Sequence, residues 1–396
     1  MTKPERDTTK DCKMTFLPRL TRRRAAAPET KQSRAAALVA VTTAGRPVWT
    51  PRDYESLARE GFAKNPVAYR CVRMIAEAAA SVPLAVFAGG RRADDHPLRR
   101  LLDQPNPEQG GPDLMEAFFG TLQVSGNGYL EAAGEGQEEL YALRPDRMKV
   151  VPGRQGWPQA YEYGVAGRSV RIGRDADGWL PLLHLKLFNP ADDYYGASPL
   201  EAAAFAIDVH NASGAWNKAL LDNSARPSGA LVYANPEAGD RLSETQFETL
   251  KAELEARTGP AAAGRPLLLE GGLDWRPMSL SPHDMDFIAG KHAAAREIAL
   301  AFGVPPQLLG IPGDNTYANF REANGAFWRH TVVPLAERAA RALTGWLGAK
   351  HPGVRIACDL DAVPALSAER DALWARLEAA TFLTPEERRR AAGLEG

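Results

Sequence analysis

Two long helices, each opened by a serine and a proline, are predicted in the second half of the chain. Ser198 opens a capping box with proline at the first helical position, and this helix continues to about Ala225 before the next proline stops it. At about 1.5 Å per residue it would be a rod of roughly 40 Å. The second helix follows a serine cap at Ser281 and ends at Phe302, because Gly303 suits the left-handed position after a helix.

An insert, 226–281, separates the two helices. It alternates strand and helix patterns, with strands expected at 231–233, 267–269 and 275–278 and a helix at 243–257. After the second helix comes a Gly/Pro-rich loop, 303–318, which leads into a long helix, 319–347. Pro334 lies inside this last helix and should kink it, because proline removes a backbone hydrogen bond.

The rest of the chain predicts a body of mixed α+β class. Residues 45–197 combine helices with short alternating strands, which cluster between 139 and 188 and indicate antiparallel pairing. Residues 348–396 predict a strand at 354–358 and two helices, the second opened by a capping box at Thr384. Residues 1–44 are basic, and we interpret them as a solvated arm; the alternative is an arm that docks or contacts DNA.

Motifs that carry enzyme chemistry are absent from the sequence. It contains no phosphate-binding G-x-x-x-x-G-K-[ST] loop, no H-E-x-x-H helix, no G-x-S-x-G turn and no paired Cys/His spacing. His184 and the nearby Asp192 would be one candidate catalytic pair. No nucleophile motif accompanies them, so we interpret His184 as a strand histidine. We therefore predict that the chain is not an enzyme and uses no metal or cofactor.

Two segments resemble the portal proteins of tailed phages. They are Asp193-Tyr194-Tyr195-Gly196-Ala197-Ser198-Pro199-Leu200 and Glu297-Ile298-Ala299-Leu300-Ala301-Phe302-Gly303-Val304-Pro305-Pro306. The order of two helices, an insert and a Gly/Pro-rich loop resembles that family as well, from about Pro51 to the C-terminus. The compact size and Ala/Arg-rich composition are similar to the portals of gene transfer agents or long-tailed phages.

The resemblance implies a portal fold with named parts. These are a basic N-terminal arm (1–44), a β-rich wing (45–197), a stem of two helices (198–225 and 282–302), a small α/β clip (226–281), a tunnel loop (303–318), a long kinked wing helix (319–347), and a wing-closing strand with a short helical crown (348–396).

The resemblance also implies the function and the partners. A portal is a ring, usually of twelve subunits, at one vertex of a virion capsid, and it is assembled in the bacterial cytoplasm. Double-stranded DNA enters and leaves through it, and it contacts the terminase large subunit, the head–tail adaptor and the major capsid protein. The alternatives are a β-rich hydrolase or nucleic-acid enzyme, and a monomeric adaptor or scaffold.

Charge and composition agree with a channel. The formal net charge of the 396 residues is −1, whereas a tight non-specific DNA binder would be strongly basic. A duplex that must slide should meet few tight contacts, so near-neutrality favours a conduit. The sequence contains no apolar run of eighteen residues, so we predict no membrane-spanning helix. The three cysteines, Cys12, Cys71 and Cys358, are interpreted as reduced thiols.

Candidate channel and docking residues follow from the resemblance. For the tunnel loop they are Gly310, Gly313, Asp314, Asn315, Thr316 and Tyr317; for the stem Lys218, Lys291 and Arg296; and for the clip Arg226, Arg265 and Arg276. If each subunit lends one rod at about 8–10 Å spacing, twelve copies give a ring roughly 35 Å across. Lys291 then either forms a ring of positive charge or pairs with a neighbouring rod, and the sequence leaves both open.

Overall fold

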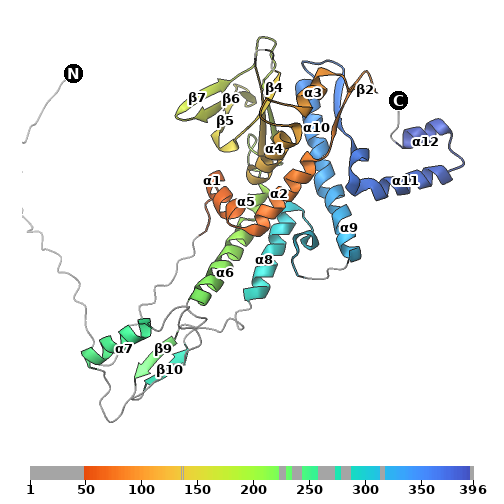
Figure 1. The fold of residues 1–396 in the computed structure, drawn as a ribbon. Coiled ribbons are helices and arrows are strands. Elements are labelled where there is room, and N and C mark those ends of the chain that lie inside the picture. Colours follow the sequence, from red (N-terminus) through yellow and green to blue (C-terminus); the bar gives the residue numbers. More distant parts are fainter. Residues whose placement is uncertain are drawn as a thin grey trace, which may run out of the picture.

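The structure is a computed structural model that describes residues 49–134, 136, 138–222, 229–233, 243–256, 273–277, 287–312 and 317–392. Helices and small sheets form a mixed α+β body, which confirms the predicted class. Two helices, α6 (Ala204–Asp222) and α8 (Phe287–Phe302), project side by side from this body (Figure 1). The described parts of the insert lie beyond their far ends.

Two packed helices form the centre of the body, α2 (Pro66–Ala80) and α4 (Gly111–Ser125). Ile75 and Phe118 lie in their shared core and are fully buried. Helix α8 also packs against α2, and Val67 in the first turn of α2 is only partly buried.

Short helical elements surround this pair. They are α1 (Tyr54–Leu57), a π-helical turn (Ala58–Ala63), α3 (Pro97–Asp103), a 3₁₀ turn (Pro145–Arg147) and α5 (Pro199–Ala202).

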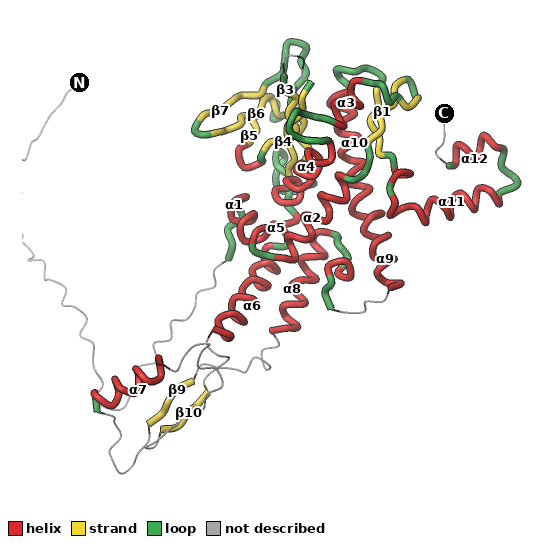
Figure 2. Tube along the Cα trace, viewed as in Figure 1, coloured by secondary structure: helices red, strands yellow, loops and turns green. Residues whose placement is uncertain are grey.

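The strands of the body form three sheets, each three-stranded and antiparallel where paired. The first has the order β4 (Glu139–Leu143), β3 (Asn127–Ala133), β8 (Leu182–Lys186). The second has the order β5 (Met148–Pro152), β6 (Pro158–Val165), β7 (Arg168–Ile172). The third has the order β11 (Val354–Cys358), β1 (Leu84–Ala88), β2 (Arg91–Arg92). The strands predicted between 139 and 188 are therefore present but divide between two sheets (Figure 2).

The long helix predicted at 319–347 is three consecutive pieces. They are α9 (Tyr317–Phe327), a π-helical turn (Trp328–Val332) and α10 (Val333–Leu347). Pro334 lies in the first turn of α10, where its missing N–H costs least. The irregularity thus falls in the turn before the proline, because that turn contains the carbonyl of His330, to which residue 334 cannot donate.

The insert and the C-terminal segment follow the predicted order where they are described. In the insert, β9 (Gly229–Tyr233) pairs antiparallel with β10 (Leu273–Pro277), and α7 (Glu244–Ala256) lies nearby. The strand expected at 267–269 and the cap at Ser281 lie outside the described residues. At the C-terminal end come α11 (Ser367–Ala379) and α12 (Pro385–Ala391), and the capping box of Thr384 is confirmed.

Candidate functional site

The projecting pair starts at a tightly packed junction. The buried Ser198 hydroxyl accepts hydrogen bonds from the N–H groups of Leu200 and Glu201, and it donates to the carbonyl of Val124 at 2.7 Å. The serine cap is therefore confirmed, and it also fastens α5 to the end of α4. The first rod is not continuous as predicted, because α5 and α6 are separated at Ala203. The Ala203 N–H donates to the carbonyls of Pro199 and Glu201, which tightens the last turn of α5.

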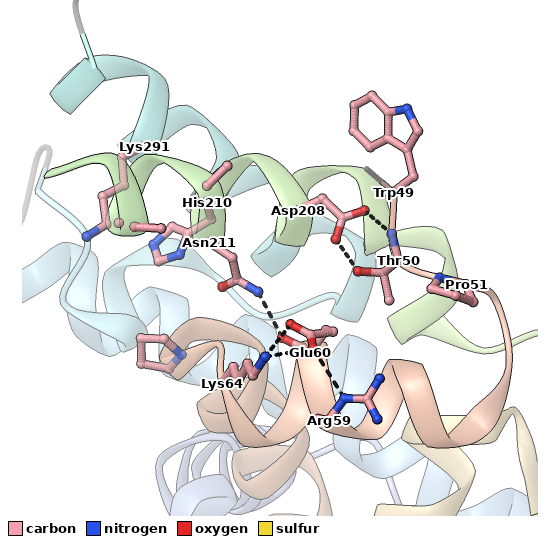
Figure 3. A pocket seen from close by; sticks show the side chains of 14 residues that line it. Trp49, Thr50, Pro51, Arg59, Glu60, Lys64, Asp208, His210, Asn211 and Lys291 are labelled. Atoms are coloured by element: carbon pink, nitrogen blue, oxygen red, sulfur yellow. Dashed lines mark hydrogen bonds and ion pairs between the residues drawn. The ribbon is translucent and has the colours of Figure 1, made fainter. Parts of the chain in front are cut away.

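A polar network fixes α6 to the body just beyond this junction. Asn65 is fully buried, and its Oδ1 accepts from two backbone N–H groups at the start of α2. Its Nδ2 donates to Asn211 Oδ1 at 3.0 Å and lies 3.2 Å from His210 Nδ1. Asn211 Nδ2 donates to the carbonyl of Glu60 at 2.9 Å (Figure 3).

The same network keeps His210 neutral. Because Asn65 Nδ2 is a donor, His210 Nδ1 must accept, and the ring carries its proton on Nε2. Burial lowers the pKa of His210, and the nearby Lys291 and His292 lower it further. His210 was not recognised as a junction residue from the sequence, because a single helical histidine carries no distinguishing pattern. Asn65, by contrast, precedes a proline at a helix start, which is a readable capping signal.

A cleft of ≈730 Å³ opens beside the network (Figure 3). Its walls are the segment 49–51, the π-helical turn, the part of α6 between Asp208 and Ala215, and Lys291 from α8. Thr50 binds the Asp208 carboxylate through both its hydroxyl and its N–H, the latter at 3.0 Å. Trp49 stacks on Phe205 with ring centroids 5.1 Å apart. Residues 49–50 are thus fastened to α6.

The three predicted stem cations lie in different environments. Lys218 pairs with Asp222 at 2.6 Å on the exposed surface of α6. The Arg296 guanidinium is exposed and donates to the carbonyl of Pro312 in the following loop. Lys291 lies on the α6 side of α8, near His210, and the described residues contain no ion pair that includes it. Both roles predicted for Lys291 involve a neighbouring copy in the assembled ring.

The loop after α8 has two glycines in left-handed conformation, and the sequence predicted this for the first of them, Gly303. Gly303 has φ +65° and ends α8, and Thr331 donates its hydroxyl to the Gly303 carbonyl at 2.6 Å. A 3₁₀ turn (Pro306–Leu309) follows, and Gly310 has φ +69° with open space beside it. Tyr317 begins α9. The other predicted tunnel-loop residues, Gly313, Asp314, Asn315 and Thr316, lie outside the described residues.

Little of the predicted docking set in the insert is described. Arg226 and Arg265 lie outside the described residues. Arg276 belongs to β10, where its backbone pairs with Ala230 of β9.

His184 is a structural histidine, as interpreted from the sequence. Its ring stacks on Tyr129 with centroids 4.3 Å apart. Its Nε2 lies 3.0 Å from Asn127 Oδ1, which also accepts from the Gly196 N–H, and its Nδ1 lies 3.3 Å from the Tyr161 hydroxyl. Burial, with a smaller effect of Lys186, lowers the pKa of His184 to about 3. The imidazole is neutral at neutral pH and holds three strands and a loop together.

The lowered pKa predicts acid sensitivity. The unfolded chain binds a proton on this histidine below pH about 6.5, whereas the folded chain does so only near the lowered pKa of about 3, so stability is lost as the pH falls through this window. Between pH 7 and pH 5 the free energy of unfolding should fall by about 2 kcal/mol from His184. Urea denaturation at the two pH values measures the change. His184→Gln should remove this part of the pH dependence, and an unchanged dependence in that variant would contradict the assignment.

Two further features are absent from the described residues. No group of histidine, cysteine, aspartate or glutamate side chains there could hold a metal ion. Among the described helices, none has the length and apolar character that a membrane span requires.

Comparison with known proteins shows the family. The model of the phage portal protein family matches residues 66–393, so the chain belongs to the phage portal protein family. It is 54% identical to a chain in the neck of an empty gene transfer agent particle computed with C6 symmetry. That match covers 89% of this chain and 96% of the other, with a TM-score of 0.71.

Two further structures agree with this assignment. A chain from the neck of the native gene transfer agent particle, computed with C12 symmetry, is 53% identical over the same shares of the two chains, with a TM-score of 0.68. A crystal structure of an HK97-family phage portal protein from Corynebacterium diphtheriae shares the fold at 16% identity and a TM-score of 0.55, and the match covers 81% of this chain and 99% of that one. The predicted resemblance is confirmed, and the chain is a structural protein, not an enzyme.

Proposed function

We propose that copies of this chain form a twelve-subunit ring in the neck of a phage-like particle, at one capsid vertex, and that double-stranded DNA passes through the ring. The observation that carries the proposal is the projecting pair of α6 and α8 in a chain 53% identical to one in a neck of C12 symmetry. Projecting rods on a firmly packed body suit a ring whose copies stand side by side as the wall of a channel.

The domain assignment follows from this proposal. The wing is 45–197 together with the long helix and β11, the stem is 198–225 with 282–302, and the clip is 226–281. The tunnel loop is 303–318, and the crown is the helical C-terminal end. The network of Asn65, His210 and Asn211 would then be the joint between wing and stem.

The charge arrangement supports loose contact with DNA. Phosphate contacts add affinity by releasing counterions, and a duplex that must move should not be held tightly. Asp222 neutralises Lys218, and Arg296 is bound to the loop carbonyl of Pro312, which limits the reach of both cations. Together with the net charge of −1, this favours weak, sequence-independent contact. Gly310 and the loop tip beyond it would narrow the channel.

The partners proposed for the ring are those of the family. The clip, with Arg226, Arg265 and Arg276, would bind the terminase large subunit during packaging and the head–tail adaptor afterwards. The wing would contact the major capsid protein. Assembly would take place in the bacterial cytoplasm, before the particle is complete.

Imaging tests the ring directly. Purified protein at high concentration should give end-on rings with a central hole in negative-stain images, and light scattering should give a mass near twelve times 42.9 kDa. Co-expression with the capsid protein of the same particle is the second condition, because a ring can depend on its capsid. A mass near that of one chain under both conditions would favour the monomeric adaptor and contradict the proposal.

A further inference from the structure

Large apolar side chains lie exposed on both helices of the projecting pair. On α6, Phe205 is 57% exposed and stacks with Trp49, which is 50% exposed. On α8, Leu300 is 80% exposed and lies opposite the buried face that contains Ile298 and Phe302. Single exposed apolar side chains are common, but here two such groups mark the two outer faces of one helix pair.

Small residues continue both faces away from the body. On α6, Ala212, Ala215 and Ala219 are exposed and follow Phe205 at helical spacing. On α8, Ala289 and Ala293 are exposed and precede Leu300 at the same spacing. Small side chains let helices approach closely, whereas the two large groups near the body would meet as anchors.

The two apolar groups lie at similar heights along the pair. The helices run antiparallel, and His210 of α6 and Lys291 of α8 line the same cleft, which sets a common level along the pair. Along α8, Leu300 lies nine residues closer to the body than Lys291. Along α6, Phe205 lies five residues closer to the body than His210. The difference is one helical turn, about 6 Å. Helical side chains lean toward the N-terminus of their own helix, so in an antiparallel pair these two lean toward each other's level.

Charges of both signs flank each group. The exposed Arg52 beside α6 donates to the carbonyl of Glu201, which is itself exposed. Arg296 and Glu297, both exposed, precede Leu300 on α8. Each face thus offers a partner for the charges of the other, and neither face carries a single sign that would repel a second copy.

We propose that the outer face of α8 packs on the outer face of α6 of the next copy, with Leu300 against the stacked rings of Trp49 and Phe205. Rotation about a ring axis keeps every residue at its own height, so a ring needs two different faces, on opposite sides and at matching heights. Leu300 and Phe205 each lie opposite the buried side of their own helix, and their heights differ by about one helical turn. This inference rests on the proposed ring and adds which surfaces close it.

Charge substitution tests the contact. Leu300→Asp and Phe205→Lys should each weaken subunit association by about 30-fold or more, as expected for a buried apolar anchor, and give monomers where the natural chain gives rings. The double variant should recover rings in part, because the two new charges are opposite. Phe188→Asp is the matched control: Phe188 is 81% exposed, on the loop after β8, and its variant should still form rings. Circular dichroism checks that all variants fold.

Disulfide cross-linking separates this contact from other modes of association. A variant with Phe205→Cys and Leu300→Cys should, on oxidation, give a ladder of covalent species beyond the dimer, because each copy links to two neighbours. A ladder that stops at the dimer would show a two-fold contact and overturn the proposal. If Leu300→Asp still formed rings as readily as the natural chain, the proposed contact would be wrong, whereas the proposed ring would stand. A natural chain that forms no ring under any condition would contradict the proposed function first, and this contact with it.

Discussion

Replacing Gly196 by alanine should destabilise the protein by about 3 kcal/mol or more, or prevent folding. A Cβ at Gly196 would lie 2.1 Å from the carbonyl oxygen of Gly126 and 2.7 Å from the backbone nitrogen of Leu187. Both are backbone atoms, so no side chain can move aside to relieve the clash. The Gly196 N–H also donates to Asn127 Oδ1 at 2.8 Å, and any displacement would stretch this bond.

The effect should reach beyond the local contact, because Gly196 lies two residues before the Ser198 cap that starts the helix pair. Thermal or urea denaturation of the purified variant measures it, with soluble yield as a first readout. Gly345→Ala in α10 is the control, since a Cβ there meets nothing within 4 Å. It should be neutral or stabilise by up to about 1 kcal/mol, because alanine favours a helix. Equal stabilities of the two variants would refute the close-packing argument.

Asn65→Ala should cost about 3 kcal/mol in the free energy of unfolding. The substitution removes the N-cap of α2, which is typically worth about 1 kcal/mol. It also leaves Asn211 Oδ1 and His210 Nδ1 without their donor beside a buried site, at about 1 kcal/mol or more for each group. Because these groups join α6 to the body, the projecting pair should loosen before the rest unfolds.

Two measurements check this prediction. Urea denaturation gives the total loss, and hydrogen exchange should show faster exchange in α6 than in α4. Asn217→Ala, in α6 and partly exposed, is the control and should change stability by less than about 0.5 kcal/mol. If Asn65→Ala and Asn217→Ala lost equally little free energy of unfolding, the hydrogen bonds of Asn65 would contribute little to holding α6 against the body.

Local signals in the sequence were sufficient for most element boundaries. The serine before Pro199, the glycine at 303 and the capping box at Thr384 act through atoms within a few residues, so each works in the same way wherever the helix packs. The same locality explains why the α+β class and the order of elements were readable. The family followed from two short segments, and the comparisons confirm it.

The tertiary structure decided what depends on residues far apart in sequence. Gly196 must be glycine because Gly126 lies against it, and no pattern near either residue shows this. His210 is buried and neutral because Asn65 faces it across the junction, and Lys291 lies beside α6 because α8 packs there. Helix caps are determined by bonds within one turn, whereas burial, charge environment and close backbone approach are determined by which surfaces meet. For that reason the sequence alone indicated two helices, and only the packed structure established the break at Ala203, the buried residues that hold α6 to the body and the exposed faces of the pair.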